Sequence, residues 1–300
     1  MSLWIPVTLA AAVFQTLRFM LQKSLSTTKL SPAGATFARF AYSAPLILAL
    51  LAVYLVATGR SLPALTASFW IFSVVGGIAQ ILATICVVTL FKQRNFAVGI
   101  TFKKTEVIQT ALVGFIVLGE GVSMGGFAAI LIGLLAVLLL SRTPGVEGSW
   151  LQHLTTRASA LGLGSGVLFA FSAVTYRGAS LQLGEIEPAL RAAITLACVV
   201  SIQTVVMAVW LGLRDRDELR AVWSTRRVAV WVGVFSMAGS FCWFLAFTLQ
   251  NAAYVKALGQ IELILSLLAS VLFFREKISG REIGGMALLG LSIILLVLAI

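Results

Sequence analysis

The chain has 300 residues, of which 60% are hydrophobic and only 11% are charged. A soluble globular domain carries about a quarter charged residues, so this composition excludes an ordinary soluble protein. The formal net charge of +11 would suit a nucleic-acid-binding surface. Basic residues also flank membrane helices and set their orientation, however, and this second interpretation fits so apolar a chain better. We therefore expect a lipid bilayer, and no nucleic acid, as the partner of the chain.

Apolar runs follow one another along the whole chain, each close to the roughly 20 residues that a helix needs to cross a bilayer. They cover residues 3–21, 35–57, 70–90, 96–118, 123–141, 160–181, 188–212, 228–249, 252–274 and 280–299. None alternates apolar and polar residues as a membrane β-strand does. We therefore expect an all-α integral membrane protein with ten transmembrane helices. The first run lacks a basic n-region and a small-residue cleavage site, so we expect it to be a span rather than a cleaved signal.

The two halves of the chain repeat one another at a constant offset of 156 residues. The offset pairs Pro32 with Pro188, Gly77 with Gly233, Cys86 with Cys242, Asn95 with Asn251, Glu106 with Glu262, Glu120 with Glu276, and Ser123 with Ser279. We therefore expect a first repeat over residues 1–142, a linker over residues 143–156 and a second repeat over residues 157–300. Five spans in each repeat make the halves antiparallel, an arrangement typical of secondary transporters with a site near the midplane. A duplicated scaffold or channel would have the same symmetry.

The paired glutamates are the strongest functional candidates. Glu106 and Glu262 lie about ten residues into their spans, close to mid-membrane at 1.5 Å per residue. A charged side chain there costs about 2.5–3.5 kcal/mol on insertion scales and usually faces a cavity or a partner. Residues three, four or eight positions away share their helix faces, namely Lys103, Gln109, Thr110 and Gly114 on one helix and Gly259, Ser266 and Ser270 on the other. Either the glutamates line a cavity, where they bind an amine or carry a coupling proton, or Lys103, Lys104 or a backbone group holds them in place.

Other polar stripes have two open interpretations, cavity lining or hydrogen bonding between helices. They are formed by Gln80 with Thr84, Ser236 with Ser240, Gln15 with Arg18 and Gln22, and Ser172 with Tyr176. A further set of basic residues lies nearer to helix ends, where snorkelling to the interface is favoured, namely Arg39, Arg177, Arg191 and Lys256. Should several of these face inward, the cavity would suit a carboxylate better than a bare cation.

The residues that catalysis or metal binding would need are missing from the predicted spans. His153 is the single histidine and falls in the linker, while Cys86, Cys198 and Cys242 are scattered over three spans without metal-like spacing. The sequence also has no phosphate-binding glycine loop. We therefore expect no enzyme, no metal site and no cofactor.

Several short motifs lie at the ends of the predicted spans or beside the paired glutamates. They are Gln22-Lys23, Ser31-Pro32, Arg39-Phe40, Thr105-Glu106-Val107, Gly119-Glu120, Gln260-Ile261-Glu262 and Arg275-Glu276-Lys277-Ile278. Together they resemble motifs of the ten-helix EamA-type branch of the drug/metabolite transporter superfamily. Val107 and Leu263 stand where that family usually has a proline after the glutamate, and Thr195 stands at the second-half arginine position. The resemblance implies alternating access around a central cavity without ATP, and export of amino acids or related small metabolites.

We therefore expect a secondary carrier that exports amino acids or similar zwitterions, as a monomer in a bacterial plasma membrane, with protons as a candidate coupling ion. Substrate or coupling candidates are Glu106, Glu262, Lys103, Gln109, Thr110, Gln80, Thr84, Gln15, Arg18, Tyr176, Ser236, Ser240, Gln260 and Ser266. An exchanger of anionic metabolites is the alternative carrier. A passive channel or a membrane scaffold is the alternative from another class.

Loop charge predicts that both termini lie outside the cytoplasm, because basic residues concentrate in the loops before even-numbered spans. These residues are Lys23, Lys29, Lys92, Arg94, Arg142, Arg157, Arg214, Arg216, Arg220, Arg226, Arg227, Arg275, Lys277 and Arg281, whereas the other internal loops carry only Arg60. The resembled family is described with both termini inside. A compartment-specific reporter fused after Ile300 should therefore be active on the outer side, and activity confined to the cytoplasm would contradict the loop-charge prediction.

Overall fold

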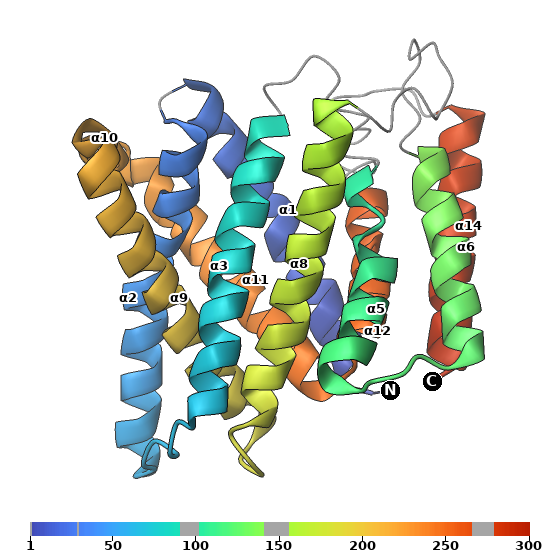
Figure 1. The fold of residues 1–300 in the computed structure, drawn as a ribbon, viewed down its shortest axis with the longest axis horizontal. Helices are drawn as coiled ribbons and strands as arrows, with labels where there is room; N and C mark the ends of the chain where they lie inside the picture. The colour runs from blue at the N-terminus through green and yellow to red at the C-terminus, as the bar shows by residue number, and fades with distance from the viewer. Residues whose placement is uncertain (1, 29, 91–101, 141–155, 266–278) are drawn as a thin grey trace. The chain divides into compact units, whose positions relative to one another are not determined.

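The computed structural model describes residues 2–28, 30–90, 102–140, 156–265 and 279–300. Every regular element named within these ranges is an α-helix (Figure 1). The helices are α1 (Trp4–Thr28), α2 (Pro32–Thr58), α3 (Ala67–Leu90), α5 (Glu106–Leu118), α6 (Met124–Leu140), α8 (Arg157–Leu181), α9 (Pro188–Arg214), α10 (Arg216–Ser224), α11 (Arg226–Leu249), α12 (Ala252–Gly259) and α14 (Gly280–Leu298).

Within the described residues, six helices are long and apolar enough to cross a membrane: α2, α3, α8, α9, α11 and α14. The helices α5 and α6 are apolar but shorter. The expected all-helical architecture is therefore confirmed for the described residues. The number of ten spans stays a prediction, because parts of the fourth and ninth expected spans fall outside those residues.

The helices form two compact units. Unit 1 consists of Met1–Ile81 and Thr175–Gln250, and unit 2 consists of Leu82–Val174 and Asn251–Ile300. The chain passes from one unit to the other within α3, again within α8, and a third time between α11 and α12. Each unit thus combines segments from both expected sequence repeats. The repeat boundaries themselves stay a prediction.

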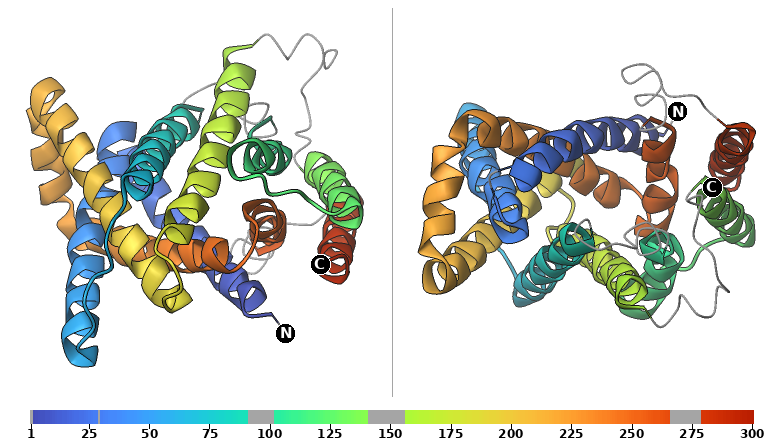
Figure 2. Two further views of the ribbon diagram at one scale, coloured as in Figure 1. Left: turned by 60° about the horizontal axis from the view of Figure 1, so that its bottom comes forward. Right: turned by 90° about the horizontal axis from the view of Figure 1, so that it is seen from above.

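Unit 1 is built around α11, which lies along α1 and also packs on α2 and α9 (Figure 2). Glycines allow these close contacts. A Cβ atom on Gly233 would meet the backbone and Cβ of Tyr42 on α2. A Cβ atom on Gly239 would lie 3.1 Å from the Cβ of Phe14 on α1. Small residues at helix crossings of this kind let the helix backbones approach one another.

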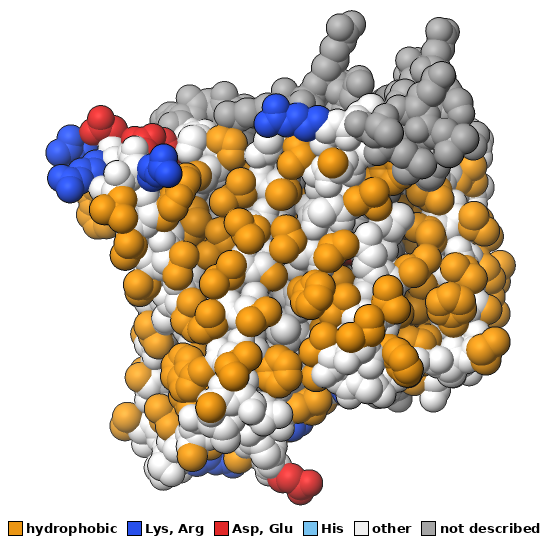
Figure 3. Space-filling view, viewed as in Figure 1, with side chains coloured by type: hydrophobic (Ala, Val, Ile, Leu, Met, Phe, Trp, Pro, Cys, Tyr) orange, Lys and Arg blue, Asp and Glu red, His pale blue; other side chains and the backbone are white. Residues whose placement is uncertain are grey.

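The short helix α10 supports the start of α2. Ser31 caps α2 by accepting a hydrogen bond from the backbone N–H of Gly34, and Pro32 occupies the first helical turn. The backbone N–H of Ser31 in turn donates to Glu218 Oε1 of α10 at 2.6 Å. The other side of α10 is polar and exposed, and charged side chains gather at this helix in Figure 3. The helix therefore joins a charged surface to the first turn of α2.

The α6 and α14 helices of unit 2 lie side by side (Figure 1 and Figure 2). Ala136, Val137 and Leu289 form a buried apolar cluster between them. The Ser292 hydroxyl donates to the backbone carbonyl of Ala129 at 2.7 Å, and this close approach is possible because Gly133 has no side chain. A hydrogen bond to a backbone carbonyl across a small-residue contact is typical of helices that associate in lipid.

Large apolar side chains point outward from helices of both units, and Figure 3 shows such side chains along the length of the helices. The exposed fraction is 84% for Val56 on α2, 80% for Leu213 and 61% for Val205 on α9, and 77% for Leu298 on α14. Apolar surface on this scale is unfavourable in water and favourable against lipid chains. Together with the helix lengths, it fits helices that are surrounded by a bilayer.

The α6–α14 contact generates a stability prediction. Gly133→Ala would place a methyl group 2.6 Å from Ser292 Oγ, and overpacking of this kind costs about 1–3 kcal/mol. We expect a lower thermal unfolding midpoint in detergent, with partial recovery in the Gly133→Ala/Ser292→Ala double variant. Gly290→Ala on α14 is the control, because a Cβ atom there meets nothing within 4 Å. An equal loss in the control would contradict the packing argument.

Candidate functional site

The candidate site lies in unit 2, where two helical segments are interrupted at positions related by the 156-residue offset. Residues 102–103 are helical, Lys104 and Thr105 form a turn, and α5 begins at Glu106. In the other half α12 ends at Gly259, Gln260 forms the turn, and residues 261–265 are helical again. Interrupted helices are typical binding elements of secondary transporters, because their free ends can face a ligand.

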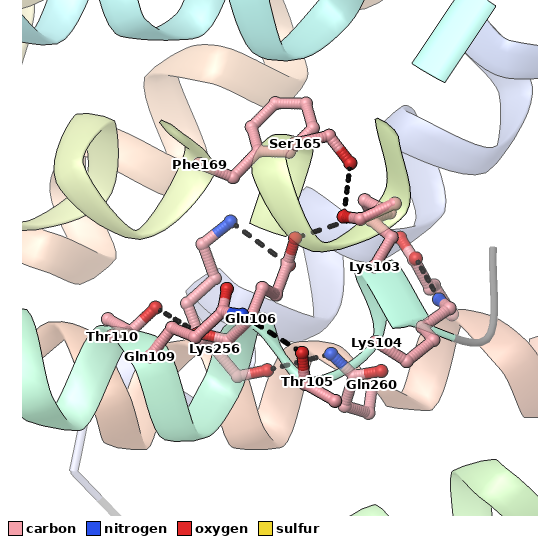
Figure 4. Close-up of polar contacts among 12 residues, drawn as sticks. Lys103, Lys104, Thr105, Glu106, Gln109, Thr110, Ser165, Phe169, Lys256 and Gln260 are labelled. Atoms are coloured by element: carbon pink, nitrogen blue, oxygen red, sulfur yellow. Dashed lines mark hydrogen bonds and ion pairs between the residues drawn. The ribbon is translucent and has the colours of Figure 1, made fainter. Parts of the chain in front are cut away.

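Charged side chains meet at these interruptions (Figure 4). The Glu106 carboxylate pairs with two lysines, since Lys103 Nζ lies 3.4 Å from Oε2 and Lys256 Nζ lies 3.5 Å from Oε1. Lys104 Nζ donates to Glu262 Oε1 at 3.1 Å. Both glutamates that the sequence singled out are therefore ion-paired, each to lysines on the other half of the chain, and Glu106 also to one on its own half.

The ion pairs are buried. Side-chain exposure is 6% for Glu106 and Lys104, 13% for Lys103, and 15% for Lys256 and Glu262. Three lysines thus share two glutamates, which leaves one positive charge in excess within this described cluster. We refer to these five residues as the lysine–glutamate cluster.

One aromatic ring lies against the same cluster. The Phe169 ring of α8 has Lys103 Nζ at 5.1 Å and Lys256 Nζ at 5.6 Å from its centroid. An ammonium group is attracted to the face of an aromatic ring at such distances, and the attraction grows when water is excluded. Phe169 therefore partly replaces the water that these two lysines lose on burial.

Two amide side chains border the cluster and have acceptor capacity left. Gln109 Nε2 donates to Thr105 Oγ1 at 3.0 Å, and Gln260 Nε2 makes a long contact of 3.5 Å to the carbonyl of Lys256. Both Oε1 atoms are buried and accept no hydrogen bond within the described part of the chain. A buried carbonyl oxygen without a donor is costly, so these two atoms are available to an N–H or O–H group of a ligand.

Unit 1 contains two other polar groups, each of which includes expected residues. Gln203 Nε2 donates to Gln80 Oε1 at 2.9 Å, and the Tyr176 hydroxyl lies 3.0 Å from the Gly76 carbonyl and 3.2 Å from Gln80 Oε1. Separately, Arg39 of α2 bonds to Ser236 and Ser240 of α11. Both groups join helices of this unit.

The remaining expected residues fall in several places. Gln15 accepts a hydrogen bond from Trp243 Nε1 at 3.0 Å, and the Thr110 hydroxyl bonds to the Glu106 carbonyl of its own helix. Arg18 and Thr84 are buried, whereas Ser266 lies outside the described residues. The structure thus brings Lys103, Glu106, Gln109, Gln260 and Glu262 together in unit 2, with Thr110 one turn along α5 from Glu106. It places the other described candidates outside this cluster.

The prediction that the side chains of Lys256 and Arg39 extend to the membrane interface is wrong. Lys256 bends to Glu106 and the Phe169 ring, and Arg39, which is 7% exposed, bonds to serines of α11. Internal acceptors hold both side chains more favourably than the interface would. Sequence reasoning also missed Gln203 and Phe169. The polar Gln203 inside an apolar run was a detectable signal, but nothing distinguished Phe169 from the other phenylalanines.

The chain is similar to known proteins in two comparisons. Residues 156–298 match the family model of the EamA-like transporter family. Among solved structures, one printed only as "Crystal structure of protein" has a TM-score of 0.73 at 16% identity, covering 98% of this chain and 96% of that chain. At this identity the second match establishes the fold alone. No curated protein matches the chain by sequence.

The buried Lys104–Glu262 pair generates a stability prediction. Removing one partner of a buried pair leaves an uncompensated charge, at a cost of about 3–5 kcal/mol. Lys104→Met should therefore lower the unfolding midpoint strongly, and the Lys104→Met/Glu262→Leu double variant should recover most of the loss. Arg220→Met is the control, because its pair with Asp217 is 84% and 88% exposed and surface pairs contribute little. A double variant no more stable than Lys104→Met would show that the two charges are not coupled.

Proposed function

We propose that this chain, a multi-pass membrane transporter with an EamA-like domain over residues 156–298, is a secondary carrier that exports amino acids or related zwitterions. EamA-like proteins are transporters rather than enzymes, which agrees with the sequence-based expectation. Transport by alternating access about a central cavity, between two inverted five-helix repeats, is part of the proposal. So are the ten spans, the monomeric state and the location in a bacterial plasma membrane.

The single observation that supports a zwitterionic substrate is the composition of the lysine–glutamate cluster. A zwitterion presents a carboxylate and an ammonium group a few ångströms apart, and the cluster offers partners for both. The excess lysine charge suits the carboxylate, while Glu106 and the free Oε1 atoms of Gln109 and Gln260 suit the ammonium group. Charged groups that are buried in a membrane protein usually mark a substrate or ion pathway.

The chemistry of binding follows from exchange of ion pairs. Glu106 is shared by Lys103 and Lys256 at 3.4 and 3.5 Å, both longer than a tight charge-assisted hydrogen bond. An incoming carboxylate can take one lysine without leaving Glu106 unpaired. The substrate ammonium group can then replace that lysine at Glu106. Exchange of this kind keeps each buried charge compensated and lowers the barrier to movement of the substrate. Protons as the coupling ion are a further part of the proposal.

An exchanger of anionic metabolites is the second candidate, and the excess of lysine over glutamate in the cluster favours it. The two carriers differ in whether the ammonium group of the substrate is required. A passive channel would show flux that does not saturate, and a scaffold would show no flux. Substrate structure and flux kinetics therefore separate all four alternatives.

The test is counterflow in proteoliposomes that contain the purified full-length chain. After a panel of amino acids has been screened by thermal shift, a labelled amino acid that stabilises the protein should accumulate saturably against its unlabelled form. If alanine is such a ligand, lactate lacks the ammonium group and alaninamide lacks the carboxylate, and neither should drive counterflow. Exchange driven equally well by lactate would favour the anion exchanger. Flux that does not saturate, or no flux with any ligand, would overturn the carrier proposal.

The role of Glu106 is tested in the same assay. Loss of a hydrogen bond to a charged group costs about 1.5–3 kcal/mol, which corresponds to a roughly 10- to 100-fold weaker apparent affinity. Glu106→Gln should show this loss. Glu187→Gln is the matched control, because Glu187 is 49% exposed and pairs with Arg60 in unit 1. Unchanged affinity in Glu106→Gln would leave this carboxylate a structural role only.

A further inference from the structure

Arg39 is a buried cation for which the described residues provide no acidic partner. It lies about 10 Å along α2 from Pro32, at 1.5 Å per residue, and it is 7% exposed. In the described part of the chain no Asp or Glu forms an ion pair with it. Arginines near the surface behave differently, since Arg60 pairs with Glu187 and Arg220 pairs with Asp217.

Neutral hydroxyl groups hold the Arg39 guanidinium in place. Nε donates to Ser236 Oγ at 2.9 Å, and one Nη2 hydrogen reaches Ser240 Oγ at 3.4 Å. The two serines lie four residues apart on α11, so they present their hydroxyls from one face of that helix. A guanidinium has five N–H donors, and within the described residues Nη1 donates to no protein acceptor.

A pair of stacked aromatic rings continues the same face of α11. Phe244 lies four residues beyond Ser240, and its ring stacks on Tyr176 with the ring centroids 4.4 Å apart. The Tyr176 hydroxyl is itself held by the Gln203 side chain at 3.3 Å. The Phe40 ring also lies against Arg39, with Cζ 5.2 Å from the ring centroid. Among the described contacts of Arg39 there are thus hydroxyl groups and an aromatic ring but no carboxylate.

An arginine that is buried without a counter-charge lowers the stability of the fold unless an anion binds to it. A buried charge without a counter-charge is strongly unfavourable, and hydroxyl acceptors compensate it only in part. The guanidinium fork matches a carboxylate in two parallel hydrogen bonds, which a lysine ammonium cannot reproduce. In this chain the fork is already oriented through Nε and Nη2, while Nη1 remains available.

We propose that Arg39, oriented by Ser236 and Ser240, is the centre of a binding site in unit 1 for the carboxylate group of a small organic anion. Arg39 makes the contact with the ligand, and the two serines are positioning residues. The site is assigned from contacts within unit 1, so it does not rest on the proposed transport or on the lysine–glutamate cluster of unit 2.

The test measures the unfolding midpoint of the full-length chain in neutral detergent against sodium acetate, lactate and benzoate. Each is compared with its neutral amide, and the ionic strength is held constant with sodium chloride. A ligand that binds only the folded chain raises the midpoint as its concentration exceeds its dissociation constant. We expect a saturable rise with at least one carboxylate and none with its amide. An equal saturable rise with chloride alone would overturn the carboxylate assignment.

Variants then locate the response. Arg39→Gln should abolish the carboxylate-dependent rise, and Arg39→Lys, which keeps the charge but loses the fork, should weaken the apparent affinity at least about tenfold, the effect of roughly one charge-assisted hydrogen bond. Ser236→Ala should weaken it less. Arg60→Gln is the control for loss of a cation at an exposed site and should keep the full response.

The unfolding midpoint measured without a carboxylate distinguishes an arginine that binds a ligand from one that has a structural role. If Arg39 is a binding residue that is buried without a counter-charge, the Arg39→Gln variant should be as stable as wild type, or more stable, when no carboxylate is present. A large loss of stability together with a retained carboxylate response would show that Arg39 is structural and would overturn the proposal. Should Arg39→Gln fail to fold, Arg39→Lys decides the question, because a full response in that variant excludes recognition by the guanidinium fork.

Discussion

Buried charge in apolar helices is the constraint on which the rest of this structure depends. An isolated ion in a low-dielectric interior is so unfavourable that it must be paired, hydrogen-bonded or neutralised. Unit 2 meets the constraint by placing three lysines around two glutamates, with the Phe169 ring against two of the ammonium groups. The interruptions before α5 and at Gln260 are where these side chains meet, so the local backbone and the charges are parts of one arrangement.

The helix ends add to the electrostatics of that arrangement. Glu106 is the first residue of α5, and Lys256 is in the last turn of α12. A carboxylate is stabilised near the N-terminus of a helix and an ammonium group near the C-terminus, because the peptide dipoles add along the axis. Each of these charges is therefore held by its own helix end as well as by its ion pair.

Unit 1 meets the same constraint in a different way. Its polar side chains, Gln80, Tyr176 and Gln203, are neutral and satisfy one another, and its buried Arg39 is held by serine hydroxyls. The two units thus contain different kinds of polar interior. The buried cluster described in unit 2 has charges of both signs, whereas the buried charged residues described in unit 1 are two arginines, Arg18 and Arg39. A carrier of zwitterions or organic anions would have a use for both.

The sequence by itself determined the all-helical architecture with apolar, membrane-spanning helices, and it singled out Glu106 and Glu262 as candidate site residues. These depend on composition, local periodicity and rare charged residues in apolar runs, all of which can be read from the amino-acid sequence. Only the tertiary structure decided which lysines pair with which glutamates and that Lys256 and Arg39 point inward. It alone placed the Phe169 ring against two lysines and Gln203 in hydrogen bonds with Gln80 and Tyr176. Lys104 and Glu262 are 158 residues apart, and Arg39 and Ser236 are 197 apart. Pairing over such separations is set by how the helices pack. A side chain as long as Lys or Arg can reach either the membrane interface or an internal acceptor. The positions of the neighbouring side chains decide which of these two orientations has the lower free energy.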